Sequence, residues 1–178
     1  MRPLSQLPQA RLPAEVMLLP HAPALTTRRL LWPDEAACAA WAAGLAGRDA
    51  LRDAFIELHG PLGAGKTTFV RHLLRALGVT GRIKSPTYAV VEPHATPALP
   101  GLAISHFDFY RFDDPREWAD AGFRDIFALP GLKLAEWPEK AAAVLPAADL
   151  RLDIEPLDGD ARRVTAEAFT PRGVALLA

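Results

Sequence analysis

FIELHGPLGAGKT, residues 55–67, is the stretch of sequence that decides the fold of this chain. Its final part, residues 60–67, fits the phosphate-binding loop template G-x-x-x-x-G-K-[ST]. The apolar residues before the loop predict a short strand. Apolar residues at helical spacing between Phe69 and Leu77 predict a helix that ends at Gly78. Strand, glycine-rich turn and helix therefore follow in the order that a phosphate-binding loop requires.

The residue types of this loop suit the binding of phosphate. Glycine at positions 60, 63 and 65 permits backbone conformations closed to other residues, so successive N–H groups can face inward at the start of the helix. Lys66 brings a positive charge to the β- and γ-phosphate oxygens, and the Thr67 hydroxyl is suited to bind Mg²⁺. A glycine-rich turn without a ligand is the alternative, and the flanking strand and helix favour nucleotide binding over it.

The composition indicates one soluble domain. The chain has 178 residues, half of them hydrophobic, which is enough for a single full core. A net charge of −1 gives no overall basic surface, so contact with nucleic acid requires a local patch or a partner protein. No apolar run approaches the ~20 residues that span a bilayer, and we expect a cytoplasmic protein without membrane or DNA partners. The single cysteine, Cys38, is predicted to be a buried small side chain.

The chain divides into a tail and a domain. Residues 1–23 hold five prolines and predict a disordered N-terminal tail, whereas residues 24–178 predict a single domain. The domain is predicted to open with an edge strand at 25–32, followed by a helix with Pro33 at its first position that ends at Gly47. Strands are also predicted at 88–92 and 102–110, and these two form a hairpin across the loop 93–101. Another strand is predicted at 131–136. The last two, at about 150–155 and 164–169, form a closing antiparallel hairpin.

Two of these strands end in an acidic residue, and the residues alone do not choose between them. Asp108 ends one strand and Glu136 ends the other. An acid at a strand end near the phosphates normally holds Mg²⁺ or its water shell. His106 could be a ligand or a base, but a packed, hydrogen-bonded histidine is the more common outcome.

Two other segments also leave alternatives open. A threonine at position 87, after the loop helix, could sense the γ-phosphate and its metal, or the segment 85–88 could be an ordinary turn. Arg162 and Arg163 could face phosphate, although a solvated pair of surface charges is the favoured interpretation.

Several spaced motifs together resemble the TsaE family, the small ATPases of bacterial tRNA threonylcarbamoyladenosine synthesis. They are Gly60-Pro61-Leu62-Gly63-Ala64-Gly65-Lys66-Thr67-Thr68, Lys84-Ser85-Pro86-Thr87-Tyr88, His106-Phe107-Asp108-Phe109-Tyr110-Arg111, Asp114-Pro115 with Glu117, Gly122-Phe123-Arg124-Asp125 and Glu136-Trp137-Pro138. The similarity covers about Trp32 to Phe169. We therefore predict an α/β fold of the P-loop NTPase type, a three-layer sandwich whose mixed central sheet has helices on both faces and a C-terminal antiparallel hairpin.

The resemblance implies a specific set of site residues. In the family, the residues matching Thr67 and Glu136 coordinate Mg²⁺, and the aspartate matching Asp108 lies near the metal and the γ-phosphate. Glu136 thus becomes the expected metal ligand, and Asp108 the group that positions the attacking water or the water shell of the metal. Lys66, Asp108 and Glu136 are the expected catalytic residues. The expected nucleotide contacts are Asp34, Gly63, Ala64, Gly65, Lys66, Thr67, Thr68, Thr87, Trp137 and Arg162.

The activity implied is Mg²⁺-dependent hydrolysis of ATP during formation of the threonylcarbamoyl group beside the anticodon of tRNAs that read codons beginning with adenine. Hydrolysis is expected to drive the cycle of a TsaD–TsaB type heterodimer, a transferase with its paralogue, and tRNA is expected to be contacted indirectly. A small-molecule kinase is the main alternative, but the loop 93–101 has none of the arginines of a kinase lid. A nucleotide-gated binding module without useful catalysis is the third.

Overall fold

The computed structural model describes residues 23–113, 116, 118 and 122–178. Of the tail predicted for residues 1–23, the described part includes only Pro23. Asp114, Pro115 and Glu117 of the family motif also lie outside the described residues. The tail and the domain boundary at residue 24 therefore stay predictions.

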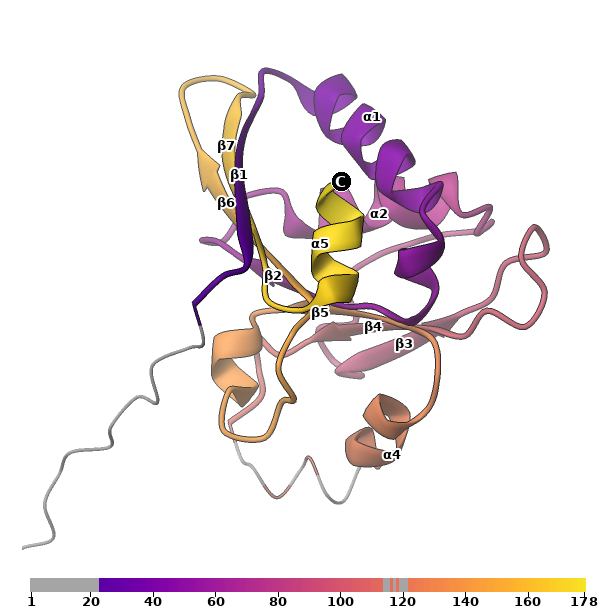
Figure 1. Cartoon of the computed structure of the whole chain (residues 1–178). Coiled ribbons are helices and arrows are strands. Elements are labelled where there is room, and N and C mark those ends of the chain that lie inside the picture. The colour runs from indigo at the N-terminus through magenta and orange to yellow at the C-terminus, as the bar shows by residue number, and fades with distance from the viewer. Residues whose placement is uncertain (1–22, 114–115, 117, 119–121) are drawn as a thin grey trace, which may run out of the picture.

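A seven-stranded mixed sheet forms the centre of the described structure, in the order β1-β7-β6-β2-β5-β4-β3 (Figure 1). The strands are β1 (Thr26–Trp32), β2 (Phe55–His59), β3 (Val91–His94), β4 (Ile104–Asp108), β5 (Leu132–Glu136), β6 (Leu150–Pro156) and β7 (Arg162–Ala168). Strands β6, β2, β5 and β4 run parallel, whereas the pairs β1–β7, β7–β6 and β3–β4 are antiparallel. The predicted edge strand and both predicted hairpins are confirmed.

Helices cover both faces of this sheet. On one face lie α1 (Glu35–Ala46), α2 (Lys66–Ala76), α5 (Pro171–Leu177) and the 3₁₀ turn η1 (Asp49–Asp53), and on the other lie α4 (Phe123–Ala128) and the 3₁₀ turn η2 (Pro138–Ala141) (Figure 1). The predicted three-layer α/β sandwich is confirmed.

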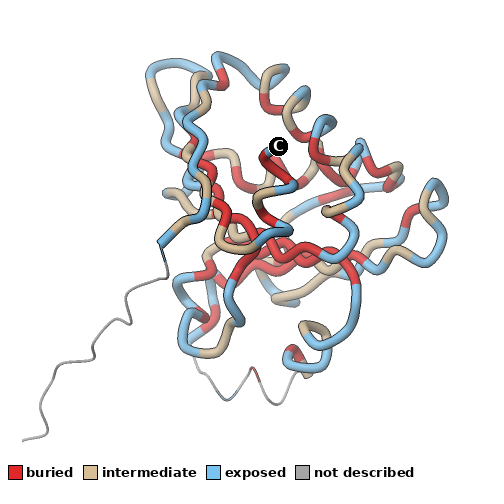
Figure 2. Tube along the Cα trace, viewed as in Figure 1, coloured by how far each residue is buried: buried red, intermediate tan, exposed pale blue. Residues whose placement is uncertain are grey.

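Each face of the sheet has its own hydrophobic core, because successive side chains of a strand point to opposite faces. Ile56 and Leu58 of β2 pack toward α1, α2 and α5, whereas Phe55 joins an aromatic cluster with Phe107 and Phe123 on the side of α4. The central strands are buried along most of their length (Figure 2). No helix in the described ranges has both the length and the apolar character needed to cross a membrane.

Three local predictions need correction. Pro33 is not the first residue of α1, because Asp34 is the N-cap and its Oδ1 accepts from the Ala37 N–H at 2.9 Å. The strand predicted from residue 88 begins only at Val91, because residues 87–89 form a turn and Val90 adopts a positive φ of 63°. The strand predicted at 102–110 is confined to β4.

The helix α5 was not predicted, although its start carries a recognisable signature. Thr170 is the N-cap and accepts from the Gly173 N–H at 3.1 Å, and Pro171 occupies the first helical position. The helix packs against β7 and η1 on the same face as α1 and α2.

Candidate functional site

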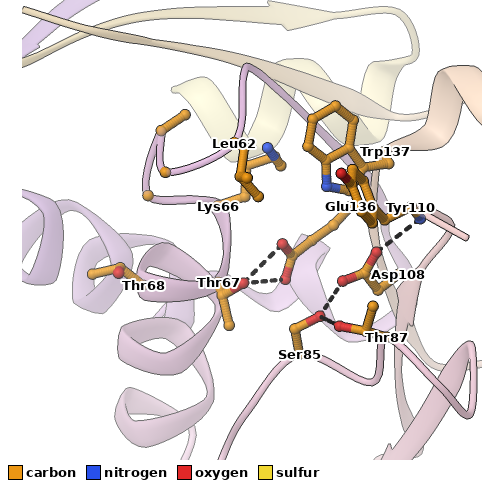
Figure 3. A pocket seen from close by; sticks show the side chains of 13 residues that line it. Leu62, Lys66, Thr67, Thr68, Ser85, Thr87, Asp108, Tyr110, Glu136 and Trp137 are labelled. Atoms are coloured by element: carbon orange, nitrogen blue, oxygen red, sulfur yellow. Dashed lines mark hydrogen bonds between the residues drawn. The ribbon is translucent and has the colours of Figure 1, made fainter.

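The carboxyl ends of the parallel strands β2, β4 and β5 meet at one edge of the sheet and carry the candidate site (Figure 3). β2 leads into the glycine-rich loop (residues 60–67), while Asp108 and Glu136 end β4 and β5 and are register partners. Together these elements enclose a cavity of about 340 Å³. Its lining residues are Leu62, Gly63, Ala64, Gly65, Lys66, Thr67, Thr68, Ser85, Thr87, Asp108, Tyr110, Glu136 and Trp137.

The glycine-rich loop takes backbone conformations that side chains oppose. Gly60, Gly63 and Gly65 have φ values of 136°, 78° and 107°, as the sequence predicted. A Cβ atom at Gly60 would lie 2.3 Å from the Ile154 carbonyl oxygen, so the loop also packs closely on β6. Gly65 caps α2 without a side-chain hydrogen bond. The first N–H groups of the helix are thus free to bind an anion, which the positive end of the helix dipole also favours.

Lys66 is buried beneath Trp137. Its Nζ donates to the carbonyl oxygens of Gly60 and Pro61 at 2.5 and 2.9 Å and lies 3.9 Å from the centre of the Trp137 ring. Burial lowers the pKa of the ammonium, and the carboxylates of Glu136, Glu139 and Asp108 oppose that shift. Lys66 is therefore a desolvated cation that neutral backbone carbonyl oxygens hold at the loop.

Thr67 and Glu136 are in direct contact. The Thr67 hydroxyl lies 2.9 and 2.8 Å from Oε1 and Oε2 of Glu136 (Figure 3), and Oε1 also contacts Nε2 of His106 at 2.9 Å. His106 is fully buried and Glu136 is 2% exposed. The expectation that His106 is a packed, hydrogen-bonded residue is confirmed. The sequence did not predict that its partner is Glu136.

Asp108 holds the segment that follows α2. The Ser85 hydroxyl donates to Oδ2 of Asp108 and lies 3.1 Å from the hydroxyl of Thr87, while the Tyr110 N–H donates to Oδ1 at 2.9 Å (Figure 3). Asp108 is 4% exposed. Ser85 thus ties the start of this segment to an acid in the cavity, whereas Tyr88 is exposed.

Trp137 has a strained backbone that aims its ring at the site. Its φ of 55° is left-handed, a conformation that costs a non-glycine residue about 1–2 kcal/mol. The ring lies over Lys66 and 5.0 Å from the ring of Tyr110. Strain of this kind clusters at functional sites.

A second, smaller cavity of about 180 Å³ lies on the other side of the start of α2. It is lined by Trp32, Asp34, Glu35, Cys38, Ala64, Gly65, Thr68, Asp160 and Arg162, so three loop or helix residues line both cavities. In Figure 3 the Thr68 side chain points away from Thr67 and Glu136. The two cavities thus form adjoining compartments around one helix start.

Arg162 and Cys38 belong to this second compartment. Arg162 donates through Nε to the Ala64 carbonyl at 2.8 Å, so its interpretation as a solvated surface charge is wrong, whereas Arg163 pairs with Glu155 at the surface. Cys38 is buried, as predicted. Its burial, aided by the charge of Glu35, raises the pKa of the thiol to about 12, which keeps the thiol neutral.

The structure brings the predicted site residues together in these two compartments. Asp34 and Arg162 line the smaller one, and the remaining predicted residues line the larger one, although their roles stay predictions. Ser85, His106 and Tyr110 contact those residues without having been assigned a role. Strand alternation could have indicated one of them, because His106 precedes Asp108 by two positions in β4.

Comparison with known proteins agrees with this architecture. The family model "Threonylcarbamoyl adenosine biosynthesis protein TsaE" matches residues 32–164. A tRNA threonylcarbamoyladenosine biosynthesis protein TsaE from Haemophilus influenzae is 43% identical over 118 residues, covering 66% of this chain and 72% of the relative. The Bacillus subtilis protein of the same name is 34% identical over 117 residues, covering 66% and 71%.

A solved structure from Bacillus subtilis has a similar fold. The crystal structure of YdiB from Bacillus subtilis superposes with a TM-score of 0.66 at 25% sequence identity, covering 85% of this chain and 92% of YdiB. The family match extends from the last residue of β1 into β7 and includes both cavities. This chain belongs to the TsaE family of threonylcarbamoyl adenosine biosynthesis proteins.

Proposed function

We propose that this protein is a Mg²⁺-dependent ATPase that acts in the cytoplasm in the biosynthesis of tRNA threonylcarbamoyladenosine. The observation that carries the proposal is the contact of the Thr67 hydroxyl with the Glu136 carboxylate in a cavity that also holds Lys66 and Asp108. A phosphate cradle, a cation and two acids at one sheet edge suit the hydrolysis of a triphosphate.

The nucleotide spans both compartments. Its triphosphate lies in the larger cavity along the glycine-rich loop, where the N–H groups at the start of α2 receive the β-phosphate. Thr68, which lines both cavities, stands at the boundary, and the nucleoside extends into the smaller cavity beside Asp34 and Arg162. The nucleotide contacts that the family resemblance implies for Asp34 and Arg162 therefore fit a cavity of their own.

Thr67 and Glu136 fit a Mg²⁺ ion. Magnesium prefers oxygen ligands in octahedral geometry at about 2.0–2.1 Å, which puts neighbouring ligands about 2.9 Å apart. The oxygens of Thr67 and Glu136 lie 2.8 and 2.9 Å apart, so the pair can serve as adjacent ligands with little movement. The ion would offset the negative charge of the phosphates.

The remaining polar groups bind the γ-phosphate and orient the attacking water. Lys66 exchanges the carbonyls of Gly60 and Pro61 for phosphate oxygens, a stronger charge-assisted contact. Asp108, released from Ser85, accepts a hydrogen bond from the attacking water and fixes its direction. The segment that carries Ser85 and Thr87 thereby becomes sensitive to the γ-phosphate.

A partner complex stimulates this reaction. Lys66 is the only cationic side chain among the described residues that line the larger cavity, so no arginine lines it to stabilise the transferring phosphoryl group. An arginine supplied by a partner raises phosphoryl-transfer rates by 10³–10⁵ in order of magnitude. We place a TsaD–TsaB type heterodimer in this role, with tRNA contacted through it.

The test is phosphate release from ATP by the purified protein, alone and with the heterodimer and tRNA. We expect slow release alone, a clear increase with the heterodimer, and none above background for Lys66→Ala in either mixture. A rate that neither the heterodimer nor tRNA changes would refute the role in tRNA modification. Consumption of ATP only after addition of a small-molecule acceptor would identify a kinase instead.

A further inference from the structure

His59, the last residue of β2, has a carboxylate beside each of its two ring nitrogens. Nε2 lies 3.0 Å from Oε2 of Glu57 in the same strand, and Nδ1 lies 3.5 Å from Oε2 of Glu139 in η2. A carboxylate only accepts hydrogen bonds, and a neutral imidazole carries a single N–H. Only the doubly protonated, positively charged ring can therefore donate to both acids at once.

The other charged groups around this ring come from β6. Oε2 of Glu57 also lies 3.6 Å from Nε of Arg151, which supplies one positive charge. Asp153, the register partner of His59, lies on the same face of the sheet and supplies a third acid. With Glu139 of η2, the cation of His59 thus meets more negative than positive charge from the strands and the turn packed around it.

The two ends of this bridge lie beside the groups that hold Lys66. Gly60 follows His59 and accepts from Nζ of Lys66 at 2.5 Å, and Trp137, two residues before Glu139, places its ring centre 3.9 Å from the same nitrogen. Burial lowers the pKa of Lys66, and the Glu139 carboxylate is among the charges that oppose this shift. The lysine is therefore enclosed between the two elements that His59 joins.

Trp137 needs support from its surroundings because its backbone is strained. Its φ of 55° is left-handed, and such residues persist only where the neighbouring structure holds them. The turn η2 begins directly after Trp137 and packs against β2, and the contact of His59 with Glu139 is an ion pair between these two elements. Loss of this contact loosens η2 and, with it, the ring that lies over Lys66.

We propose that His59 is a positioning residue, whose imidazolium joins η2 to β2 and so holds Trp137 and Lys66 in the arrangement that receives a triphosphate. This inference rests on the proposed ATPase function and gives its phosphate site a dependence on pH. The charge of histidine changes between about pH 5 and 8, and loss of either ring proton removes one half of the bridge. The affinity for a triphosphate therefore falls as the pH rises through this range.

The test measures the affinity for inorganic tripolyphosphate at pH 6 and pH 8.5, at a fixed Mg²⁺ concentration, in the unaltered protein and in His59→Gln, Glu139→Gln and His72→Gln. His72→Gln is the matched control, because His72 also contacts a glutamate, Glu35, at 2.8 Å, but it joins α1 to α2 and lines neither cavity.

Between pH 6 and pH 8.5, we expect the unaltered protein and His72→Gln to lose about two- to fivefold more affinity than His59→Gln and Glu139→Gln. This factor is the effect of one partly exposed ion pair. Titration of the ligand's own phosphates cancels when proteins are compared at the same pH. Because the Glu139 side chain is 47% exposed, Glu139→Gln should fold even where His59→Gln is unstable.

Two results would overturn the inference. One is an equal dependence on pH in all four proteins. The other is a loss of affinity in His59→Gln that is the same at pH 6 and pH 8.5, because that pattern would show a structural role independent of the charge of the ring. Failure of the unaltered protein to bind either ATP or tripolyphosphate at pH 6 would instead refute the proposed function itself.

Discussion

Asp108 and Glu136 are register partners at the ends of the adjacent parallel strands β4 and β5, and their carboxylates line one cavity but have different partners. Glu136 contacts Thr67 and His106, whereas Asp108 accepts from Ser85 and the Tyr110 backbone. Each acid is thus tied to a different part of the chain. We therefore expect the two acids to have different roles in the reaction.

Isosteric amides separate the two roles. Glu136→Gln should raise the Mg²⁺ concentration that gives half-maximal ATPase activity, because one ligand loses its charge. Asp108→Asn should leave that concentration unchanged and lower kcat by at least about a hundredfold, because the amide is a poor acceptor for the proton of the water. Magnesium titrations of both variants, with ATP binding as the control for folding, decide this. A shared loss of Mg²⁺ affinity would contradict the division.

His106 should act by positioning Glu136. Its Nε2 lies 2.9 Å from the Glu136 carboxylate, and side chains that orient a metal ligand typically contribute 10–100-fold in metal affinity. We expect His106→Ala to raise the required Mg²⁺ concentration about tenfold while excess Mg²⁺ restores most of kcat. His106→Gln, whose amide can still donate, should retain most of the affinity. A loss of kcat that no Mg²⁺ concentration repairs would argue against positioning.

Local features of the sequence predicted the glycine-rich loop and both hairpins, because glycine conformation and strand alternation depend on neighbouring residues. Gly65 and Gly78 adopt the expected left-handed conformations. The contact between Thr67 and Glu136 depends instead on β5 lying beside β2, a strand order that no local pattern contains. The resemblance to the TsaE family, not periodicity, favoured Glu136 over Asp108 as the metal ligand.

The misplaced boundaries have local causes, whereas the place of Arg162 does not. The start of α1 shifted because the Asp34 side chain caps the helix, and β3 began late because Val90 turns the chain with a positive φ. The place of Arg162 beside the loop follows from the strand order β7-β6-β2, which joins distant parts of the chain. Tertiary pairing, not local propensity, thus determines how the smaller cavity is built.

Cys38 should make the protein less stable at alkaline pH. Its thiol pKa is raised from 9.0 to about 12 in the folded state, so between these values the unfolded chain releases a proton that the folded chain keeps. The unfolded state binds fewer protons there, and the free energy of unfolding falls as pH rises, by up to about 1.4 kcal/mol per pH unit. Cys38→Ala should lack this contribution.

Urea denaturation at pH 8 and pH 10 measures this contribution. The stability difference between the original protein and Cys38→Ala should shift in favour of the variant at pH 10, while other titrating groups cancel in the comparison. An identical difference at both pH values would show that the thiol ionises as readily when folded as when unfolded.

Two helical glycines should respond to alanine in opposite directions. Gly44 lies on the exposed side of α1, and a Cβ there meets no atom within 4 Å, so Gly44→Ala should stabilise the protein by about 0.5–1 kcal/mol through helix propensity. A Cβ at Gly173 of α5 would lie 1.9 Å from the Asp149 carbonyl oxygen. Gly173→Ala should therefore destabilise the protein by about 1–3 kcal/mol, because the helix must move away from β6.

Chemical denaturation of both variants at neutral pH measures these changes, and their opposite signs exclude a general effect of alanine. Because α5 packs on β7 and η1 and lines neither cavity of the site, Gly173→Ala should leave ATP affinity unchanged at temperatures where it stays folded. If Gly173→Ala were as stable as the original chain, α5 would not pack against the Asp149 backbone as closely as described, and the C-terminal helix would contribute little to the fold.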